Sequence, residues 1–285
     1  MTQSVNKRLA DLFQSLHHQA FEEVKPYWGY SSPAISNYAA GFTENLPDQT
    51  HPTSYADLLA SAANHQVVLF GDFHAFGNSQ ETFVKLISDF QKSYPDKKIA
   101  IGLEMNRASD QKSINDFLSG KINELTFLKQ IEYQKHWGFL WDNFKPIFEL
   151  AKETHAYIFG VNSDESNEND ITARDKFTAN QIKQYQSKHP EQTIFILIGE
   201  YHLAPKHLPQ ALKQASDEIS TLSILCNTDK YSLAQDHLEY PQYYSIENYG
   251  FCIVNSPSWL KWHSLNLWAE PKRKNLTRKN HEDED

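Results

Sequence analysis

Two stretches of the sequence, far apart in the chain, share one short design. Apolar residues at 66–70 lead into a glycine, an acid, an aromatic and a histidine at 71–74 (GDFH), and the run 193–198 leads into the same order at 199–202 (GEYH). An apolar run that ends in glycine is typical of a buried strand in a parallel sheet. Ligands of such sheets bind beyond the carboxyl ends of the strands. The repeated design therefore predicts a site at one edge of a sheet.

Further apolar runs of strand length alternate with stretches of helical periodicity. Strand, helix and strand at this spacing form parallel crossover units, which are right-handed. We therefore expect an α/β fold with a mostly parallel sheet flanked by helices. The predicted strands are 66–70, 99–104, 156–161, 193–198, 221–225 and 251–255.

The sequence divides into three segments. Residues 1–53 are expected to form an amphipathic helix, which ends before Pro26, and a covering loop. Residues 54–256 are the α/β domain, with a helical insert at about 106–154 over the carboxyl edge of the sheet. Residues 257–285 are an aromatic segment followed by a charged tail for which we expect no structure. Near the start of the domain, Ser54 and Asp57 predict a capped helix.

Composition limits the class of protein. The chain has 285 residues and a net charge of −9, and this negative charge argues against a nucleic-acid partner. A homodimer remains possible. No run of apolar residues is long enough to span a bilayer. Cys226 and Cys252 are the only cysteines and form no CxxC, so we expect buried free thiols. Without an apolar leader or an early lipidation cysteine, the chain as given is expected to be cytoplasmic.

Polar side chains at the strand ends converge on the same edge of the predicted sheet. His74 and His202 follow two strands, and Glu104 ends another. Two imidazoles and one carboxylate are a common ligand set for a catalytic divalent metal ion. The sequence thus predicts a metal site at His74, Glu104 and His202.

Three more residues are predicted to contribute catalytic chemistry at this edge. Asp72 and Glu200, each two residues before a histidine, would orient the imidazoles or act as a general base. Arg174 is the cation that the predicted strands bring near, and it would bind a substrate carboxylate or phosphate. A lone strand-end histidine is more often structural. Two copies and an acid together favour a functional site.

Other enzyme classes lack their motifs. The sequence contains no GxSxG, HExxH or P-loop, and no GxGxxG follows the first strand. Cys226 ends a strand, but no base is visible beside it, so a core thiol is the better interpretation. Serine hydrolases, zincins, nucleoside triphosphatases and dinucleotide-dependent enzymes are therefore disfavoured.

An ordered set of motifs over roughly residues 55–214 resembles the ChaN-like haem-binding uptake family. This family lies in a superfamily with erythromycin esterase, Tiki and TraB proteins. The residues that carry the resemblance are VVLFGDFH, IGLEM at 101–105, FLSG at 117–120, Trp137-Gly138-Phe139, Pro146, Ala151, Gly160-Val161-Asn162, Arg174-Asp175 and IGEYH.

The resemblance implies a site built from both GxxH motifs and the glutamate, here His74, Glu104 and His202. It also implies haem binding and iron acquisition, and family members can be exported. Haem ligation would need a Tyr or His at the pocket mouth, for which Tyr201 and His207 are the candidates. The aromatic residues of the helical insert around Trp137 would suit a flat ligand.

Two functions are therefore expected from the sequence. In the first, the pocket binds haem or a divalent metal ion. The alternative is a metal-dependent hydrolase of the Tiki or erythromycin esterase type.

Overall fold

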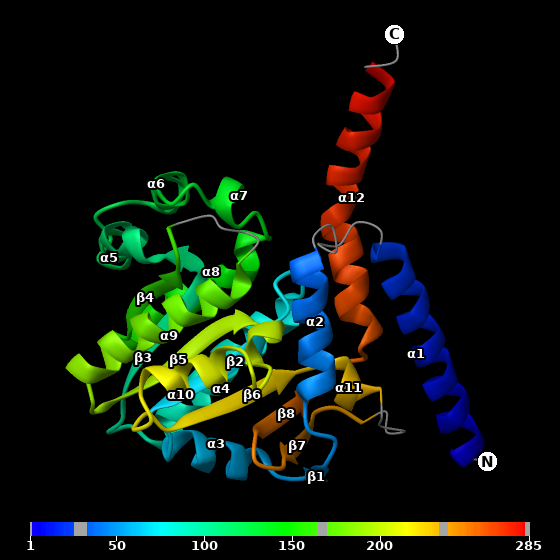
Figure 1. Ribbon diagram of the computed structural model, residues 1–285, viewed down its shortest axis with the longest axis horizontal. Helices are drawn as coiled ribbons and strands as arrows, with labels where there is room; N and C mark the ends of the chain where they lie inside the picture. Colours follow the sequence, from blue (N-terminus) through cyan, green and yellow to red (C-terminus); the bar gives the residue numbers. More distant parts are fainter. Residues whose placement is uncertain (1, 26–32, 165–169, 234–238, 283–285) are drawn as a thin grey trace.

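The predicted apolar runs form the centre of a single sheet in the computed structural model, which describes residues 2–25, 33–164, 170–233 and 239–282 (Figure 1). The strand order in this part of the chain is β1-β7-β8-β6-β2-β5-β3-β4. All six predicted strands are confirmed. The strands are β1 Thr50–Pro52, β2 Val67–Asp72, β3 Lys98–Arg107, β4 Tyr157–Asn162, β5 Gln192–Gly199, β6 Thr221–Cys226, β7 Gln242–Ile246 and β8 Gly250–Val254.

Strands β2 and β5 are parallel neighbours at the centre of the sheet. Their register runs from Val67 opposite Ile194 to Asp72 opposite Gly199. The GDFH and GEYH motifs therefore leave the sheet side by side. Strand β3 pairs in parallel with the other side of β5. This pairing brings Glu104 of β3 to the same edge of the sheet as the two motifs.

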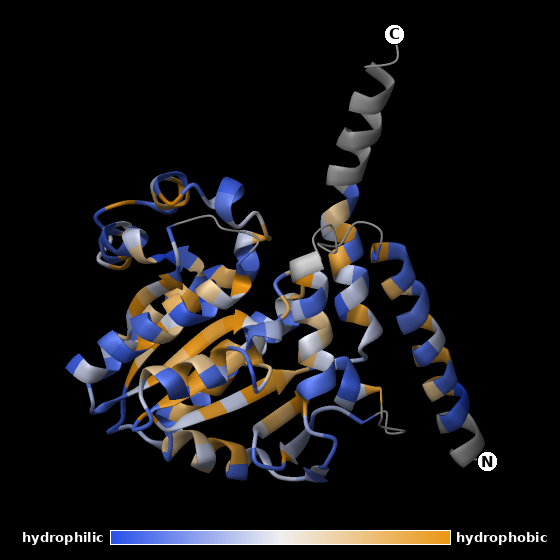
Figure 2. Cartoon of the chain, viewed as in Figure 1, coloured by the Kyte–Doolittle hydropathy of each residue, from blue (hydrophilic) through white to orange (hydrophobic). Residues whose placement is uncertain are grey.

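The two sheet faces are covered by helices. On one face lie α3 Tyr55–Ala63, α4 Gly77–Ser93 and α8 Trp141–Thr154, over a core rich in phenylalanine. Helices α9 Ile171–Lys188 and α10 Leu208–Ala215 cover the other face. Figure 2 shows that hydrophobic residues concentrate on the strands between these layers. The mostly parallel α/β fold with flanking helices is confirmed.

The capping prediction for α3 is also confirmed. The Ser54 hydroxyl accepts a hydrogen bond from the backbone N–H of Asp57, and the Asp57 carboxylate accepts one from the Ser54 N–H. Such a reciprocal cap satisfies two backbone donors that have no partner inside the helix.

The helical insert is present, but one of its helices packs on a face of the sheet instead of on its carboxyl edge. It comprises η1 Ala108–Asp110, α5 Gln111–Leu118, α6 Glu124–Gln130, α7 Tyr133–His136 and α8. Helix α8 packs on the sheet face beside α4 and serves as the crossover between β3 and β4. The short segment between α7 and α8 reaches the carboxyl edge, where Trp137 and Phe139 contact His74.

The predicted covering loop at 27–53 was wrong for much of its length. Residues 33–45 form helix α2 (Pro33–Asn45), residues 50–52 form β1, and residues 26–32 lie outside the described part. The serine, proline and asparagine residues of this segment are typical of loops, so the helical spacing of Tyr38, Phe42 and Asn45 was not recognised in the sequence. Phe42 packs into the core on the α9 side, and this tertiary contact outweighs weak local propensity.

At the other end of the chain, helix α12 Trp259–Glu282 occupies the segment predicted as aromatic residues and a tail without structure. It packs along α1 Thr2–Val24, beside the sheet (Figure 1). Ala20 and Val24 of α1 share an apolar cluster with Trp262 and Leu265 of α12 and with Phe73. This packing brings the first part of α12 to the GDFH motif. In the described residues, no helix combines the length and apolar character needed to span a membrane.

Candidate functional site

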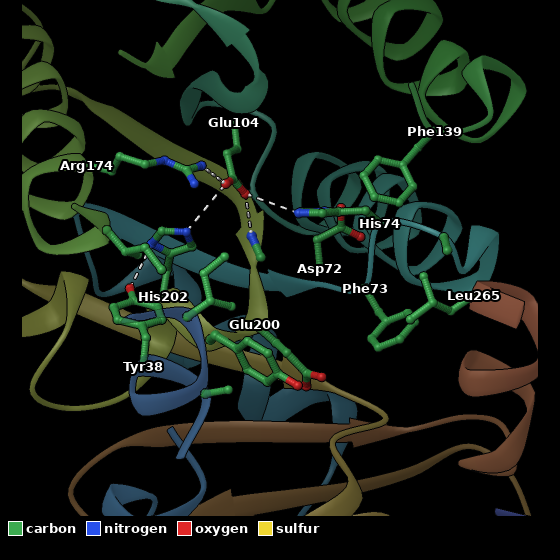
Figure 3. Close-up of a pocket in the computed structure, with 16 residues that line it drawn as sticks. Tyr38, Asp72, Phe73, His74, Glu104, Phe139, Arg174, Glu200, His202 and Leu265 are labelled. Atoms are coloured by element: carbon green, nitrogen blue, oxygen red, sulfur yellow. Dashed lines mark hydrogen bonds and ion pairs between the residues drawn. The ribbon is translucent and has the colours of Figure 1, made fainter. Parts of the chain in front are cut away.

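A pocket of about 380 Å³ lies at the carboxyl ends of β2, β3 and β5 (Figure 3). Its polar floor comes from the two motifs, from β3 and from the start of α9. Apolar side chains from α2, the insert and α12 form its walls. The lining residues are Ile35, Tyr38, Ala39, Asp72, Phe73, His74, Ala75, Glu104, Phe139, Ile171, Arg174, Gly199, Glu200, Tyr201, His202 and Leu265.

The first histidine is held by the acid of its own motif. Nδ1 of His74 lies 2.7 Å from Oδ2 of Asp72, the last residue of β2. Gln80 of α4 donates a hydrogen bond to the other oxygen of this carboxylate. The rings of Trp137 and Phe139 lie 4.4 Å and 5.1 Å from the imidazole. These contacts fix the ring and leave Nε2 directed at the floor of the pocket.

The second histidine is held by an acid from another element. Nδ1 of His202 lies 2.5 Å from Oδ1 of Asp175, near the start of α9. The Tyr38 hydroxyl of α2 donates to the other Asp175 oxygen at 2.7 Å and also lies 2.9 Å from Nδ1 of His202. Both imidazoles are therefore Asp–His pairs whose Nε2 atoms point to the same place.

Glu104 lies between the two pairs. Its Oε2 is 3.6 Å from Nε2 of His74, and its Oε1 is 3.4 Å from Nε2 of His202. Arg174 donates to Oε1 at 2.6 Å, and the backbone N–H of Gly199 donates to Oε2 at 2.7 Å. A side chain on Gly199 would meet the His74 ring at 3.3 Å, so the close approach of this backbone depends on glycine.

These charges shift the protonation of the site strongly. Burial alone raises the pKa of Glu104, but His202, His74 and Arg174 outweigh burial and hold it well below its usual range. Burial lowers the pKa of His202, but Glu104 and Asp175 outweigh it and raise the pKa to about 9. The pKa of His74 is also raised, because Asp72 and Glu104 outweigh burial. His202 is therefore an imidazolium at neutral pH, facing an ionised Glu104.

Glu200 does not orient His202, contrary to the sequence-based expectation. Its carboxylate accepts hydrogen bonds from Thr228 at 2.8 Å and from Lys261 at 3.1 Å. The sheet register explains this, since Asp72 pairs with Gly199 and Glu200 lies one position further on. A shift of one residue turns a side chain to the opposite side of a strand. Asp175 takes the role predicted for Glu200.

The other predicted residues are distributed unevenly around the pocket. Arg174 and Tyr201 line it, and Trp137 supports His74 from behind. His207 does not line it: its Nδ1 lies 2.6 Å from the carbonyl oxygen of Tyr201, and its ring stacks on Tyr38 at 3.8 Å. Sequence reasoning noted the Arg174-Asp175 pair without giving Asp175 a role, and no local signal pointed to Tyr38.

The predicted metal site is not confirmed. Within the described residues, no group of three or more His, Cys, Asp or Glu side chains is arranged to hold a metal ion. The carboxylate of Glu104 already carries a guanidinium on one oxygen and a backbone N–H on the other. Arg174 thus supplies positive charge where a bound cation would sit, and the two charges would repel each other.

Comparison with protein families identifies the central part of the chain. Residues 58–174 match the model of the family described as "Haem-binding uptake, Tiki superfamily, ChaN". This match covers less than half of the chain, and it shows that the central part is similar to the ChaN-like family. The matched segment contains Asp72, His74, Glu104 and Arg174, whereas Asp175, His202 and helices α2 and α12 lie outside it. The comparison with curated proteins finds no match.

Three solved structures are similar to this chain at low sequence identity. ChaN of Campylobacter jejuni, in a structure described as cofacial heme binding, is 13% identical, with a TM-score of 0.50 over 72% of this chain and 92% of that one. The type III effector HopBA1 is 14% identical, with a TM-score of 0.48 over 75% and 99% of the two chains. A mutant of the erythromycin esterase EreC in its open conformation is 11% identical, with a TM-score of 0.48 over 71% and 79%.

Proposed function

We propose that this ChaN-like chain is a hydrolase that uses its two histidines as general base and general acid on a carbonyl substrate. The observation that carries the proposal is the pair of Asp–His contacts whose Nε2 atoms face Glu104 from both sides. A carboxylate on Nδ1 fixes the tautomer and the direction of an imidazole, as acid–base catalysis requires.

His74 is the proposed general base. Its side chain is 23% exposed, compared with 9% for His202, so it is the imidazole more accessible from the pocket. In the neutral ring, with Nδ1–H donated to Asp72, Nε2 has a free lone pair, and because the pKa of His74 is raised this form prevails only above the ordinary His pKa. The distance of 3.6 Å to Glu104 is longer than a hydrogen bond. A water molecule bound beside Nε2 would lose a proton to His74 as it attacks the carbonyl carbon.

His202 and Arg174 are proposed to stabilise the developing oxyanion. A pKa of about 9 keeps His202 protonated at neutral pH, so its Nε2–H can donate. The guanidinium of Arg174 is bound to Glu104 on the same side of the pocket. Glu104 stabilises both cations and keeps them in place. His202 then gives its proton to the leaving group, which completes the proton transfer begun by His74.

The walls of the pocket suggest the kind of substrate. Ile35, Ala39, Phe139 and Leu265 form an apolar surface next to the polar floor. Such a surface favours an ester whose acyl or alcohol part is apolar. This proposal departs from the metal-dependent hydrolase expected from the sequence, because Arg174 and the His202 imidazolium supply the positive charge themselves.

The test is hydrolysis of p-nitrophenyl esters of increasing acyl length by the purified full chain. We expect turnover that persists in EDTA and that falls at least roughly 10²-fold in His74→Gln. His136→Gln is the matched control, because His136 contacts Glu132 and Arg107 on the insert and does not line the pocket. Hydrolysis that is absent from the wild type, or unchanged in His74→Gln, would contradict the proposal.

Haem binding is a second candidate function, favoured by the family match and by the apolar walls. Haem needs a flat apolar surface and an axial ligand, and Nε2 of His74 or the ring of Tyr201 faces this pocket. His207 is not a suitable ligand, because its ring is stacked and hydrogen-bonded. Titration of haem into the protein should give a saturable Soret shift that weakens in Tyr201→Phe or His74→Ala. A non-saturating spectrum would exclude this candidate, and elemental analysis of the same sample tests divalent-metal binding.

A further inference from the structure

A buried lysine lies behind the site, on a helix outside the residues matched by the family model. Lys261 of α12 is 1% exposed. Its ammonium lies 3.1 Å from Oε1 of Glu200 and 3.2 Å from Oδ1 of Asp229. Burying an ammonium is costly unless it is well paired. Its two carboxylate partners therefore restrict where α12 can dock.

Lys261 contacts both histidine motifs. It binds Glu200 of GEYH, and it lies over the ring of Phe73 of GDFH at 5.2 Å from the ring centroid. Glu200 and Phe73 are equivalent positions in register, because the preceding residues Gly199 and Asp72 are paired between β5 and β2. One side chain thus contacts residues of both strand ends.

Neighbouring residues on α12 extend this contact. Trp262 packs its ring edge-on against Phe73 at 5.3 Å, and its Nε1–H lies 2.9 Å from Asp229 and 3.0 Å from Nε2 of His17 on α1. Leu265, one turn further along α12, lines the pocket itself. Helices α1 and α12 are therefore connected to both motifs by polar and aromatic contacts.

We infer that Lys261 is a positioning residue: by binding Glu200 and Phe73 together it sets the relative position of His74 and His202, and it couples helices α12 and α1 to the site. The contribution to catalysis rests on the proposed hydrolase function. The geometric part does not, because it concerns the imidazoles themselves.

The first test is Lys261→Met, which keeps the length of the side chain and removes its charge. Lys230→Met is the matched control, because Lys230 lies on α11 Asp229–Ser232 and binds Asp48 and the Leu46 carbonyl without touching either motif. The readout is the pH titration of the histidine ring C–H signals by NMR, assigned through His74→Gln and His202→Gln. This readout needs no substrate, so it can fail or succeed independently of hydrolysis.

In Lys261→Met we expect the titration midpoints of His74 and His202 to rise by about 0.5 pH unit or more, since Glu200 loses its cation. Lys230→Met should leave both midpoints unchanged. We expect the ester kcat of Lys261→Met to fall roughly tenfold or more with little change in KM. Unchanged midpoints in a folded Lys261→Met protein would overturn the inference, because a lysine that only supports folding would lower Tm alone.

A second variant, Lys261→Met with Glu200→Gln, removes the buried pair together and keeps the test informative if the single variant is unstable. Replacing both partners usually restores stability. The midpoints should return toward those of the wild type, because Glu200 no longer has a charge and Asp229 keeps its contacts with His17 and Trp262. The kcat should stay low, because no ionic contact joins α12 to GEYH. Wild-type kcat in this double variant would overturn the positioning role.

Discussion

The GDFH and GEYH motifs are alike in sequence and unlike in structure. In GDFH the acid of the motif, Asp72, binds its own histidine. In GEYH the acid, Glu200, turns away to Lys261, and Asp175 of α9 binds the histidine in its place. The two motifs are offset by one residue in the sheet register, and the acids therefore project to different sides. A repeated motif specified where the imidazoles are, but not which acids orient them.

The surroundings of the two imidazoles differ as well. His74 is more exposed and lies against Trp137 and Phe139 of the insert. His202 is nearly buried and is closed off by Tyr38 of α2. This difference leads us to propose separate roles, with His74 as the base and His202 as the acid. Substitutions that change one Asp–His pair at a time test whether the two histidines have separate roles.

The largest effect is expected when either histidine is removed. In His74→Gln and in His202→Gln, kcat/KM for ester hydrolysis should fall on the order of 10² to 10⁴-fold, the usual contribution of a general acid or base. The wild-type pH profile should rise above the ordinary His pKa as His74 loses its proton and fall near pH 9 as His202 does. Residual activity should lack the acid limb in His74→Gln and the alkaline limb in His202→Gln. Loss of the same limb in both variants would disprove the assignment.

The next effect compares the two acids of the second motif. Asp175→Asn should lower kcat on the order of 10²-fold and move the alkaline limb to lower pH, because it removes the charge that orients His202. Glu200→Gln should lower kcat roughly tenfold, through positioning alone. Its main cost should be in the free energy of unfolding, about 3–5 kcal/mol, because Lys261 loses a buried partner. Urea unfolding measures the loss of stability, and pH–rate profiles measure the change in the alkaline limb. Identical pH–rate profiles for Asp175→Asn and Glu200→Gln would argue against the role assigned to Asp175.

Stability should depend on pH through His202. Its pKa in the folded protein, about 9, lies above the unfolded value near 6.5, so the folded state binds this proton more tightly. The stabilisation is complete below about pH 6.5 and is lost as pH rises to about 9, with a total on the order of 3 kcal/mol. Urea unfolding at pH 6, 7.5 and 9 should show this decline, and His202→Gln should flatten it. An equally steep decline in the variant would assign the effect to another group.

The smallest effect is expected from substitution of Tyr38, which contacts the Asp175–His202 pair and not the Asp72–His74 pair. Tyr38→Phe removes the hydroxyl that donates to Asp175 and should cost about 1 kcal/mol of unfolding free energy. The NMR titration of His202 should change, while that of His74 should not. Gln80→Leu is the corresponding change at Asp72, and it should affect His74 selectively. A change in both histidines from either substitution would mean that the two pairs are not independent.

The parallel strands and the edge at which they end were predictable from the sequence. Strand ends of a parallel sheet meet at one edge, so Asp72, His74, Glu104 and His202 were predictable as neighbours from local pattern alone. The reciprocal cap at Ser54 and Asp57 was predictable for a similar reason, because it depends on residues three apart in one helix.

The groups that complete the site became visible only in the folded chain. Asp175 reaches His202 from α9, Tyr38 comes from helix α2, in a segment that was predicted as a loop, and Lys261 comes from the C-terminal helix α12. These contacts depend on how distant helices pack on the sheet and on the one-residue offset of the two motifs within the register of β2 and β5. Local periodicity contains neither, because side-chain partners between elements are fixed by packing rather than by sequence spacing.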